Sequence, residues 1–206
     1  MTDLAQRERQ ALLDLLEELG PDAPTCCEGW TTLDLAAHLA VRERRLDAAV
    51  GLVAKGLGGH TERVRLRYRE KGLSTLVGML RQQPRWSPLS TTSLDRMVNT
   101  VEYFVHHEDV RRAQPQWEPR SLPRADNEEL WRKSSMAKLL LRRTGLTVTL
   151  SSPAYGRRTI GRGPVDATVS GKPGEIVLFC SGRQDVAKVE VTGPQAERLR
   201  QTDLNL

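Results

Sequence analysis

The sequence has little cysteine, few aromatic residues and no long apolar run. Its three cysteines, Cys26, Cys27 and Cys180, are an odd number with two of them adjacent, which does not suit the disulfide framework of a secreted protein. The adjacent pair also lacks the spacing of a structural zinc site, so we interpret both residues as buried or reactive thiols. A reducing compartment fits this cysteine usage.

Membrane and export signals are missing as well. No stretch approaches the roughly 20 apolar residues of a membrane helix. The N-terminus, MTDLAQRERQ, lacks the basic-then-apolar pattern of a signal peptide. We therefore expect a cytoplasmic protein with no membrane partner.

Patterns typical of other functions are also absent. Aromatic residues make up only 4% of the 206 residues, and no aromatic-rich basic strand accompanies the net charge of +5. Ordinary solvation explains such a charge better than nucleic-acid binding does. The chain contains neither a glycine-rich phosphate loop nor a Ser/His/Asp nucleophile pattern. An acidic small molecule would suit the weakly basic surface, but net charge cannot identify it.

Helical periodicity dominates the first half of the chain. Apolar residues recur at helical spacing over residues 3–19, and a Gly-Pro pair then ends the segment. Thr31 and Asp34 have the spacing of a capping box, which predicts a second helix running to about Val50. Further helices are expected at Thr61–Lys71, at Leu73–Gln82 and from Ser93 toward Arg112.

The second half has a mixed character. Residues 127–143 are helical in pattern, and the turn-rich residues 151–164 follow a short alternating segment. The alternating segments LTVTL, ATVSG and VAKVEVTG predict strands, and PQAERLRQ predicts a closing helix. The apolar run EIVLFC fits either a buried strand or a short helix.

A proline-containing polar stretch separates the two halves. Pro115, Pro119 and Pro123 lie in it, a composition typical of a linker between domains. We therefore predict an α+β chain with a helical domain at residues 1–114 and a small α/β domain at residues 124–206.

Three residues could bind one metal ion. Glu102 and His106 are four residues apart in the best-patterned helix, so their side chains share one face beside an apolar stripe. His38, between Leu35 and Val41, could supply a third ligand from a facing helix. This set suits a divalent metal, with zinc expected and an open fourth position, although nickel, cobalt or iron would also accept it. The alternative to a metal site is that the Glu102–His106 spacing arises by chance and that His38 is an ordinary histidine of the core.

Residues next to His106 have less direct roles. His107 points about 100° away from His106, so we expect a surface or interface residue. Asp109 could accept the second ring proton of His106, as carboxylates often do beside metal-bound histidines. The alternative is a solvated Asp109 paired with Arg111 or Arg112.

Two stretches carry a family resemblance. CEGWTTLDLAAHL and NTVEYFVHHEDVRRA resemble the two signature stretches of the mycothiol-dependent maleylpyruvate isomerase family. The resemblance implies a DinB-like four-helix bundle for the first domain. It also implies that His38, Glu102 and His106 hold a zinc ion. This chain has Glu28 where the family commonly has proline in Cys-Pro-Gly-Trp.

The resemblance extends to the second domain. Family members often append a small α/β domain similar to sterol carrier proteins, and GKPGEIVLFCSGR resembles part of it. In some members an arginine there is thought to assist the thiol cofactor, which makes Arg183 a candidate site residue. The alternative is a surface arginine in a turn.

The resemblance also implies a function. It indicates a thiol-dependent metalloenzyme, an isomerase or a thiol transferase, with mycothiol as the low-molecular-weight thiol and a small electrophile as its substrate. The alternative is a non-catalytic metal-binding sensor or regulatory protein. An open coordination position that accepts a thiol would favour the enzyme, whereas a fourth protein ligand such as Cys27 or His107 would favour the sensor.

Overall fold

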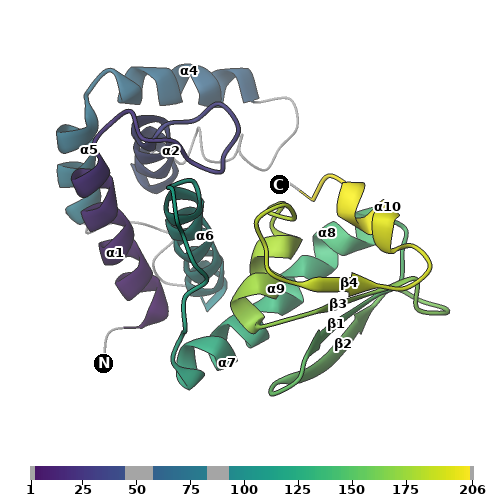
Figure 1. The fold of residues 1–206 in the computed structure, drawn as a ribbon. Coiled ribbons are helices and arrows are strands. Elements are labelled where there is room, and N and C mark those ends of the chain that lie inside the picture. The colour runs from purple at the N-terminus through teal and green to yellow at the C-terminus, as the bar shows by residue number, and fades with distance from the viewer. Residues whose placement is uncertain (1–2, 45–57, 83–92, 205–206) are drawn as a thin grey trace. The chain divides into compact units, whose positions relative to one another are not determined.

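The computed structural model of the chain describes residues 3–44, 58–82 and 93–204 (Figure 1). It combines helices with one four-stranded sheet, which agrees with the predicted α+β class. The chain divides into two compact units, Met1–Glu118 and Pro119–Leu206. Within the described ranges, none of the helices has both the length and the apolar character of a membrane span.

The first unit is helical. Asp3 caps the first helix by accepting a hydrogen bond from the Gln6 backbone N–H at 3.0 Å. One hydrogen bond of the predicted capping box is present at the second helix, where Asp34 Oδ2 accepts from the Thr31 backbone N–H at 3.2 Å. The expected extension of that helix to Val50 falls outside the described residues. The helices are α1 (Leu4–Leu19), α2 (Thr32–Arg44), α4 (Gly58–Arg69), α5 (Leu73–Arg81) and α6 (Ser93–Arg112).

Apolar packing holds these helices together. α1 packs against α5 and α6, and α2 packs against α4 and α5. Burial of each large apolar side chain stabilises the fold by about 1.5–3 kcal/mol relative to exposure. The core includes Leu12, Leu13, Leu16, Leu35, Leu39, Leu76, Leu80, Tyr103 and Val110. It holds in place α2 and α6, which carry the predicted metal ligands. The more specific four-helix bundle arrangement stays a prediction.

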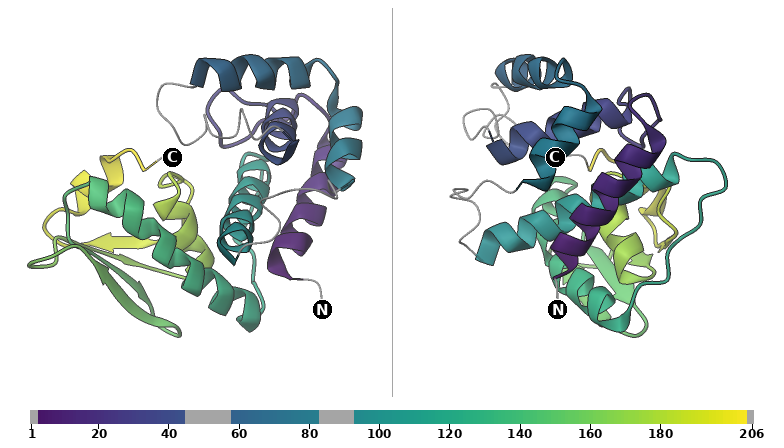
Figure 2. Two further views of the ribbon diagram at one scale, coloured as in Figure 1. Left: turned by 180° about the vertical axis from the view of Figure 1, so that it is seen from behind. Right: turned by 90° about the vertical axis from the view of Figure 1, so that its left-hand side faces the viewer.

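The second unit is built around a sheet of order β2-β1-β3-β4 (Figure 1). Figure 2 shows the same fold from two further sides. β1 and β3 are parallel, and the other two pairings are antiparallel. The elements are α7 (Arg124–Lys133), the 3-10 helix η3 (Ser134–Met136), α8 (Ala137–Arg143), β1 (Val148–Ser152), β2 (Gly156–Ile160), β3 (Ala167–Ser170), α9 (Pro173–Cys180), β4 (Glu190–Thr192) and α10 (Ala196–Gln201).

One face of this sheet carries the apolar core. Val148 and Leu150 of β1 lie beside Ala167 and Val169 of β3, and all four are fully buried. They belong to one core cluster with residues of α8 and α9, so these helices cover that face. Alternation places Thr149 and its cross-strand neighbours Thr159 and Thr168 on the opposite face.

Two features of this unit differ from the sequence-based expectation, and a third decides between two alternatives that the sequence left open. The turn-rich segment contains a strand, β2, whose residues are mostly exposed. The apolar run EIVLFC lies in the helix α9, which begins at Pro173 and is buried along its whole length. The helix expected at 127–143 is interrupted by the 3-10 turn η3. β2 is set by its backbone pairing with β1, and the apolar α9 is set by its complete burial, so in both cases the fold and not local periodicity decides the outcome.

Candidate metal centre

Two helices bring three candidate ligands together. His38 comes from α2, and Glu102 and His106 come from adjacent turns of α6. Glu102 Oε1 lies 3.2 Å from His38 Nε2 and 3.3 Å from His106 Nε2. The three donor atoms all lie within 4.8 Å of one another. The trio that helical spacing suggested is therefore assembled in space.

The donors fit a single divalent ion. Metal–nitrogen and metal–oxygen bonds of about 2.0 Å in a tetrahedron separate neighbouring donors by about 3.3 Å. The two separations measured from Glu102 agree with that value. Two imidazole nitrogens and a carboxylate oxygen form a set that zinc accepts, and nickel, cobalt or iron also accept it. Without a metal, the same separations allow hydrogen bonds.

Glu102 supplies a negative charge to the site. Burial works to raise the pKa of Glu102, but hydrogen bonds from His106 and His38 and the charge of Arg42 outweigh burial and hold this pKa well below its ordinary value. Arg42 Nε lies 3.4 Å from Glu102 Oε1, and its Nη1 donates to Asn99 Oδ1. Glu102 is therefore a carboxylate at neutral pH and an available ligand.

The two histidines of the trio have opposite tendencies in the metal-free protein. Burial lowers the pKa of His38, and the hydrogen bond to Glu102 offsets only part of that effect. Burial also works to lower the pKa of His106, but hydrogen bonds to Asp109, Cys27 and Glu102 raise it well above its ordinary value. A metal must therefore displace a more tightly held proton from His106 than from His38.

Asp109 orients the imidazole of His106. Its Oδ2 lies 2.9 Å from His106 Nδ1, and its side chain is only 1% exposed. The expected hydrogen bond is therefore present, and it directs a proton to Nδ1 and leaves Nε2 free to bind a metal. Arg111 and Arg112, the partners of Asp109 in the alternative, both donate to Glu108.

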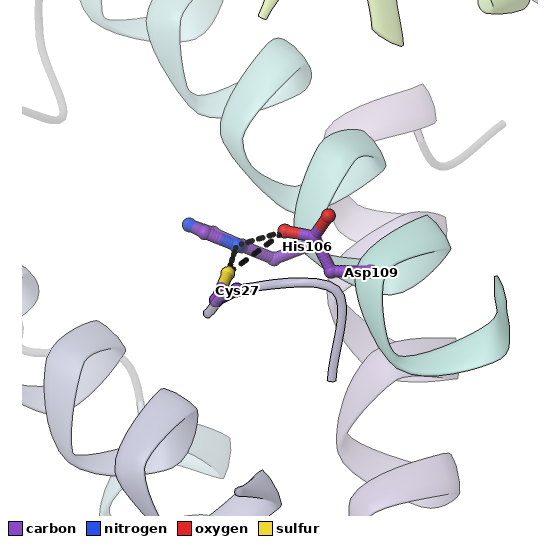
Figure 3. A group of neighbouring side chains, drawn as sticks. All are labelled: Cys27, His106 and Asp109. Atoms are coloured by element: carbon purple, nitrogen blue, oxygen red, sulfur yellow. Dashed lines mark hydrogen bonds and ion pairs between the residues drawn. The ribbon is translucent and has the colours of Figure 1, made fainter. Parts of the chain in front are cut away.

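A thiol lies beside Asp109 on the Nδ1 side of the same imidazole. Cys27 Sγ donates to Asp109 Oδ2 at 3.2 Å and lies 4.0 Å from His106 Nδ1 (Figure 3). The loop that carries it is attached to α6, because the Cys26 backbone N–H donates to the Asp109 carbonyl at 2.9 Å. Cys27, His106 and Asp109 thus form a second group of donors within 4.8 Å. Sequence spacing could not reveal this group across 82 residues.

Aromatic rings line the histidine pair. The Trp30 ring lies 5.2 Å from the His38 ring in a tilted arrangement, and His38 meets His106 edge-on at the same separation. The Arg65 guanidinium lies over Trp30 at 5.0 Å from the ring centroid. These contacts restrict the rotation of His38 and so help fix the position of its Nε2.

His107 corrects one expectation. It is buried, with 6% exposure, and its Nδ1 lies 2.7 Å from Glu8 Oε2 of α1. Helical geometry correctly separates it from His106, but the residue expected at a surface or an interface is buried against α1. Neither candidate donor group in the described residues includes His107.

Arg183 lies in the second unit, after α9. Its Nη1 donates to the Ser181 carbonyl, and its backbone N–H donates to the Leu178 carbonyl. Gly182 precedes it with a φ of 82°, a left-handed conformation that favours glycine. Arg183 thus follows a well-defined helix end, and its role in any reaction stays a prediction.

No family model and no curated protein matches the sequence. Among solved structures, the chain is similar to the mycothiol-dependent maleylpyruvate isomerase, with 17% identity, a TM-score of 0.54, and coverage of 92% of this chain and 90% of that chain. A variant of that isomerase with one histidine replaced by alanine gives a TM-score of 0.55 at the same identity and coverage. These matches show a shared fold, and a fold alone does not determine activity.

Proposed function

We propose that this protein is a metalloenzyme that activates a low-molecular-weight thiol for attack on a small electrophile, as an isomerase or a thiol transferase. The observation that carries the proposal is the convergence of His38 Nε2, Glu102 Oε1 and His106 Nε2 from two helices. The shared fold with a mycothiol-dependent isomerase supports mycothiol as the thiol.

The described side chains have distinct roles in this proposal. His38, Glu102 and His106 hold the ion, and three protein ligands leave a further position for a thiol. A bound zinc-like ion would supply Lewis-acid chemistry and lower the pKa of that thiol. Asp109 keeps the His106 ring in the tautomer whose Nε2 faces Glu102. Trp30 limits the rotation of His38.

We also propose that Arg183 orients a carboxylate of the thiol or of the substrate. Guanidinium groups suit this task because they bind carboxylates with two parallel hydrogen bonds. Since Arg183 lies outside the unit that holds the trio, Arg183→Ala should leave metal content unchanged. Thiol affinity or turnover should fall, and rescue by Arg183→Lys should be incomplete. Unchanged thiol affinity and turnover would remove Arg183 from the proposal.

Cobalt substitution tests the proposal directly. A sulfur ligand adds an intense charge-transfer band to Co²⁺ that nitrogen and oxygen ligands do not give. The experiment uses the Cys26→Ser/Cys27→Ser double variant, so that no nearby protein thiol can produce the band. Cys180 is buried in the apolar core of the second unit, and burial raises the pKa of its thiol to about 12.

Adding mycothiol to the cobalt-loaded double variant should produce the sulfur band. Glu102→Ala in the same background should weaken it, because the ion loses one of its three ligands. If cobalt binds but no band develops at saturating thiol, the thiol-dependent enzyme is wrong. A metal-binding sensor or regulatory protein would then be the better account.

A further inference from the structure

We propose that Cys27, His106 and Asp109 form a second metal site, selective for a thiophilic divalent cation, on the Nδ1 side of His106 (Figure 3). This site shares one residue with the trio but uses the other nitrogen of the ring. The inference does not depend on the proposed enzyme activity, because it concerns binding by protein donors alone.

The donor separations suit coordination of one ion. With bonds of about 2.0 Å to nitrogen and oxygen and about 2.3 Å to sulfur, tetrahedral donors lie about 3.3–3.6 Å apart. In the protein the three separations are 2.9 Å from Nδ1 to Oδ2, 3.2 Å from Sγ to Oδ2 and 4.0 Å from Sγ to Nδ1. Shifts of roughly half an ångström would bring all three to bonding positions.

Charge and burial also suit a cation. Binding would displace the proton from His106 Nδ1 and release the proton of the Cys27 thiol, and the thiolate together with the Asp109 carboxylate would neutralise a divalent ion. His106 and Asp109 are buried, whereas Cys27 is half-buried, so an ion can approach from the side of the cysteine. A thiolate ligand selects for softer ions such as zinc and cadmium over magnesium or calcium.

The two sites should exclude each other. A neutral imidazole has one nitrogen that accepts and one that carries a proton, so His106 binds one ion at a time without becoming doubly deprotonated. Each arrangement has an acceptor in place for the remaining proton. With the ion on Nε2, Nδ1–H donates to Asp109 at 2.9 Å; with the ion on Nδ1, Nε2–H donates to Glu102 at 3.3 Å. The identity of the ion would then decide which site fills.

Cadmium is the probe for the second site. The full chain carries His38→Ala and Glu102→Gln to remove the trio, and a phosphine reductant keeps the cysteines reduced without adding a thiol. Titration with Cd²⁺ should produce a thiolate-to-cadmium band in the ultraviolet, with an end point of one equivalent. Adding Cys27→Ser should abolish the band, while adding Cys26→Ser should preserve it, because only Cys27 contributes to the donor group.

Two results would overturn the inference. One is the absence of the band in the variant without the trio, with circular dichroism showing an intact helical fold. The other is a band that survives Cys27→Ser. If the double trio substitution prevents folding, Cys27→Ser and Cys26→Ser are compared in the Glu102→Gln single variant, in which the trio still lacks its carboxylate. A negative cadmium result would not affect the cobalt experiment that tests the proposed function, since that experiment uses a variant without Cys26 and Cys27.

Discussion

The adjacent histidines of α6 have different partners, and His107 joins α6 to α1 through Glu8. His107 Nδ1 and Glu8 Oε2 lie 2.7 Å apart, with side-chain exposures of 8% and 5%. The preceding residue, His106, faces Glu102 and Asp109 instead. A rotation of about 100° per residue thus separates a stabilising contact between helices from a candidate metal ligand.

His107→Ala should destabilise the protein without removing metal. The substitution leaves a buried carboxylate short of one hydrogen bond, which costs about 2–3 kcal/mol. Urea unfolding of the metal-free protein would measure the loss, and metal analysis should show unchanged stoichiometry. The Glu8→Ala/His107→Ala double variant should lose less stability than the sum of the single changes. Additive losses would show that the two residues are not coupled.

His106→Ala, by contrast, should weaken metal binding. We expect zinc affinity to fall more than about 100-fold, because loss of an outer partner of a ligand already costs 10–100-fold. Competition with a chromophoric chelator would measure the affinity. His60→Ala is a suitable control, because His60 is an exposed histidine of α4. The ligand assignment is wrong if His106→Ala keeps full affinity while His107→Ala loses it.

Asp109→Ala should weaken zinc binding by the trio by about 10–100-fold. The carboxylate directs the proton of His106 to Nδ1, and without it the ring can rotate or take the other tautomer. Glu102 and both histidines remain, so stoichiometry should stay at one ion. The same chelator competition applies. An affinity equal to that of the unchanged chain would indicate that Asp109 does not orient the ligand.

Asp34 should make stability depend on pH in the acid range. Burial works to raise its pKa, but the hydrogen bond from Arg65 and those from Thr31 outweigh burial and lower it. A lowered pKa in the folded state gives stability that is present above the ordinary value of 3.8 and is lost as pH falls through the lowered value. Asp34→Asn should therefore cost about 2 kcal/mol at pH 7.

The difference between Asp34→Asn and the unchanged chain should shrink as the pH falls below 4. Urea unfolding of both proteins at a series of pH values would measure it, and other carboxylates cancel in the comparison. Asparagine can still accept from the Thr31 N–H, so the cap is retained. A difference that stays constant with pH would show that the charge of Asp34 contributes nothing.

A fragment of residues 1–118 should fold and bind metal. All residues of the trio lie within it, and the first unit has a core separate from that of the second. We expect zinc affinity within a few-fold of that of the full chain, measured by the same competition. A helical, soluble fragment with no affinity would mean that the second unit provides a ligand.

Some features follow from sequence because their causes are local. The capping box at Thr31 and Asp34 involves residues three apart, and Glu102 and His106 share a face because they are four apart on one helix. By contrast, β2 escaped prediction because an exposed strand has no apolar alternation, and its sequence GRRTI reflects that.

The sequence by itself determined the α+β class, because helical and alternating apolar patterns occupy different parts of the chain. It also determined the capping of α2 and the carboxylate–histidine pair of α6, since spacing along one helix sets these two relations. Only the tertiary structure decided which segments meet. It brought His38 to Glu102 across 64 residues, Cys27 to Asp109 across 82, and Glu8 to His107 across 99. Such contacts depend on how helices bury their apolar faces against one another, a property of the packed core that no local pattern specifies.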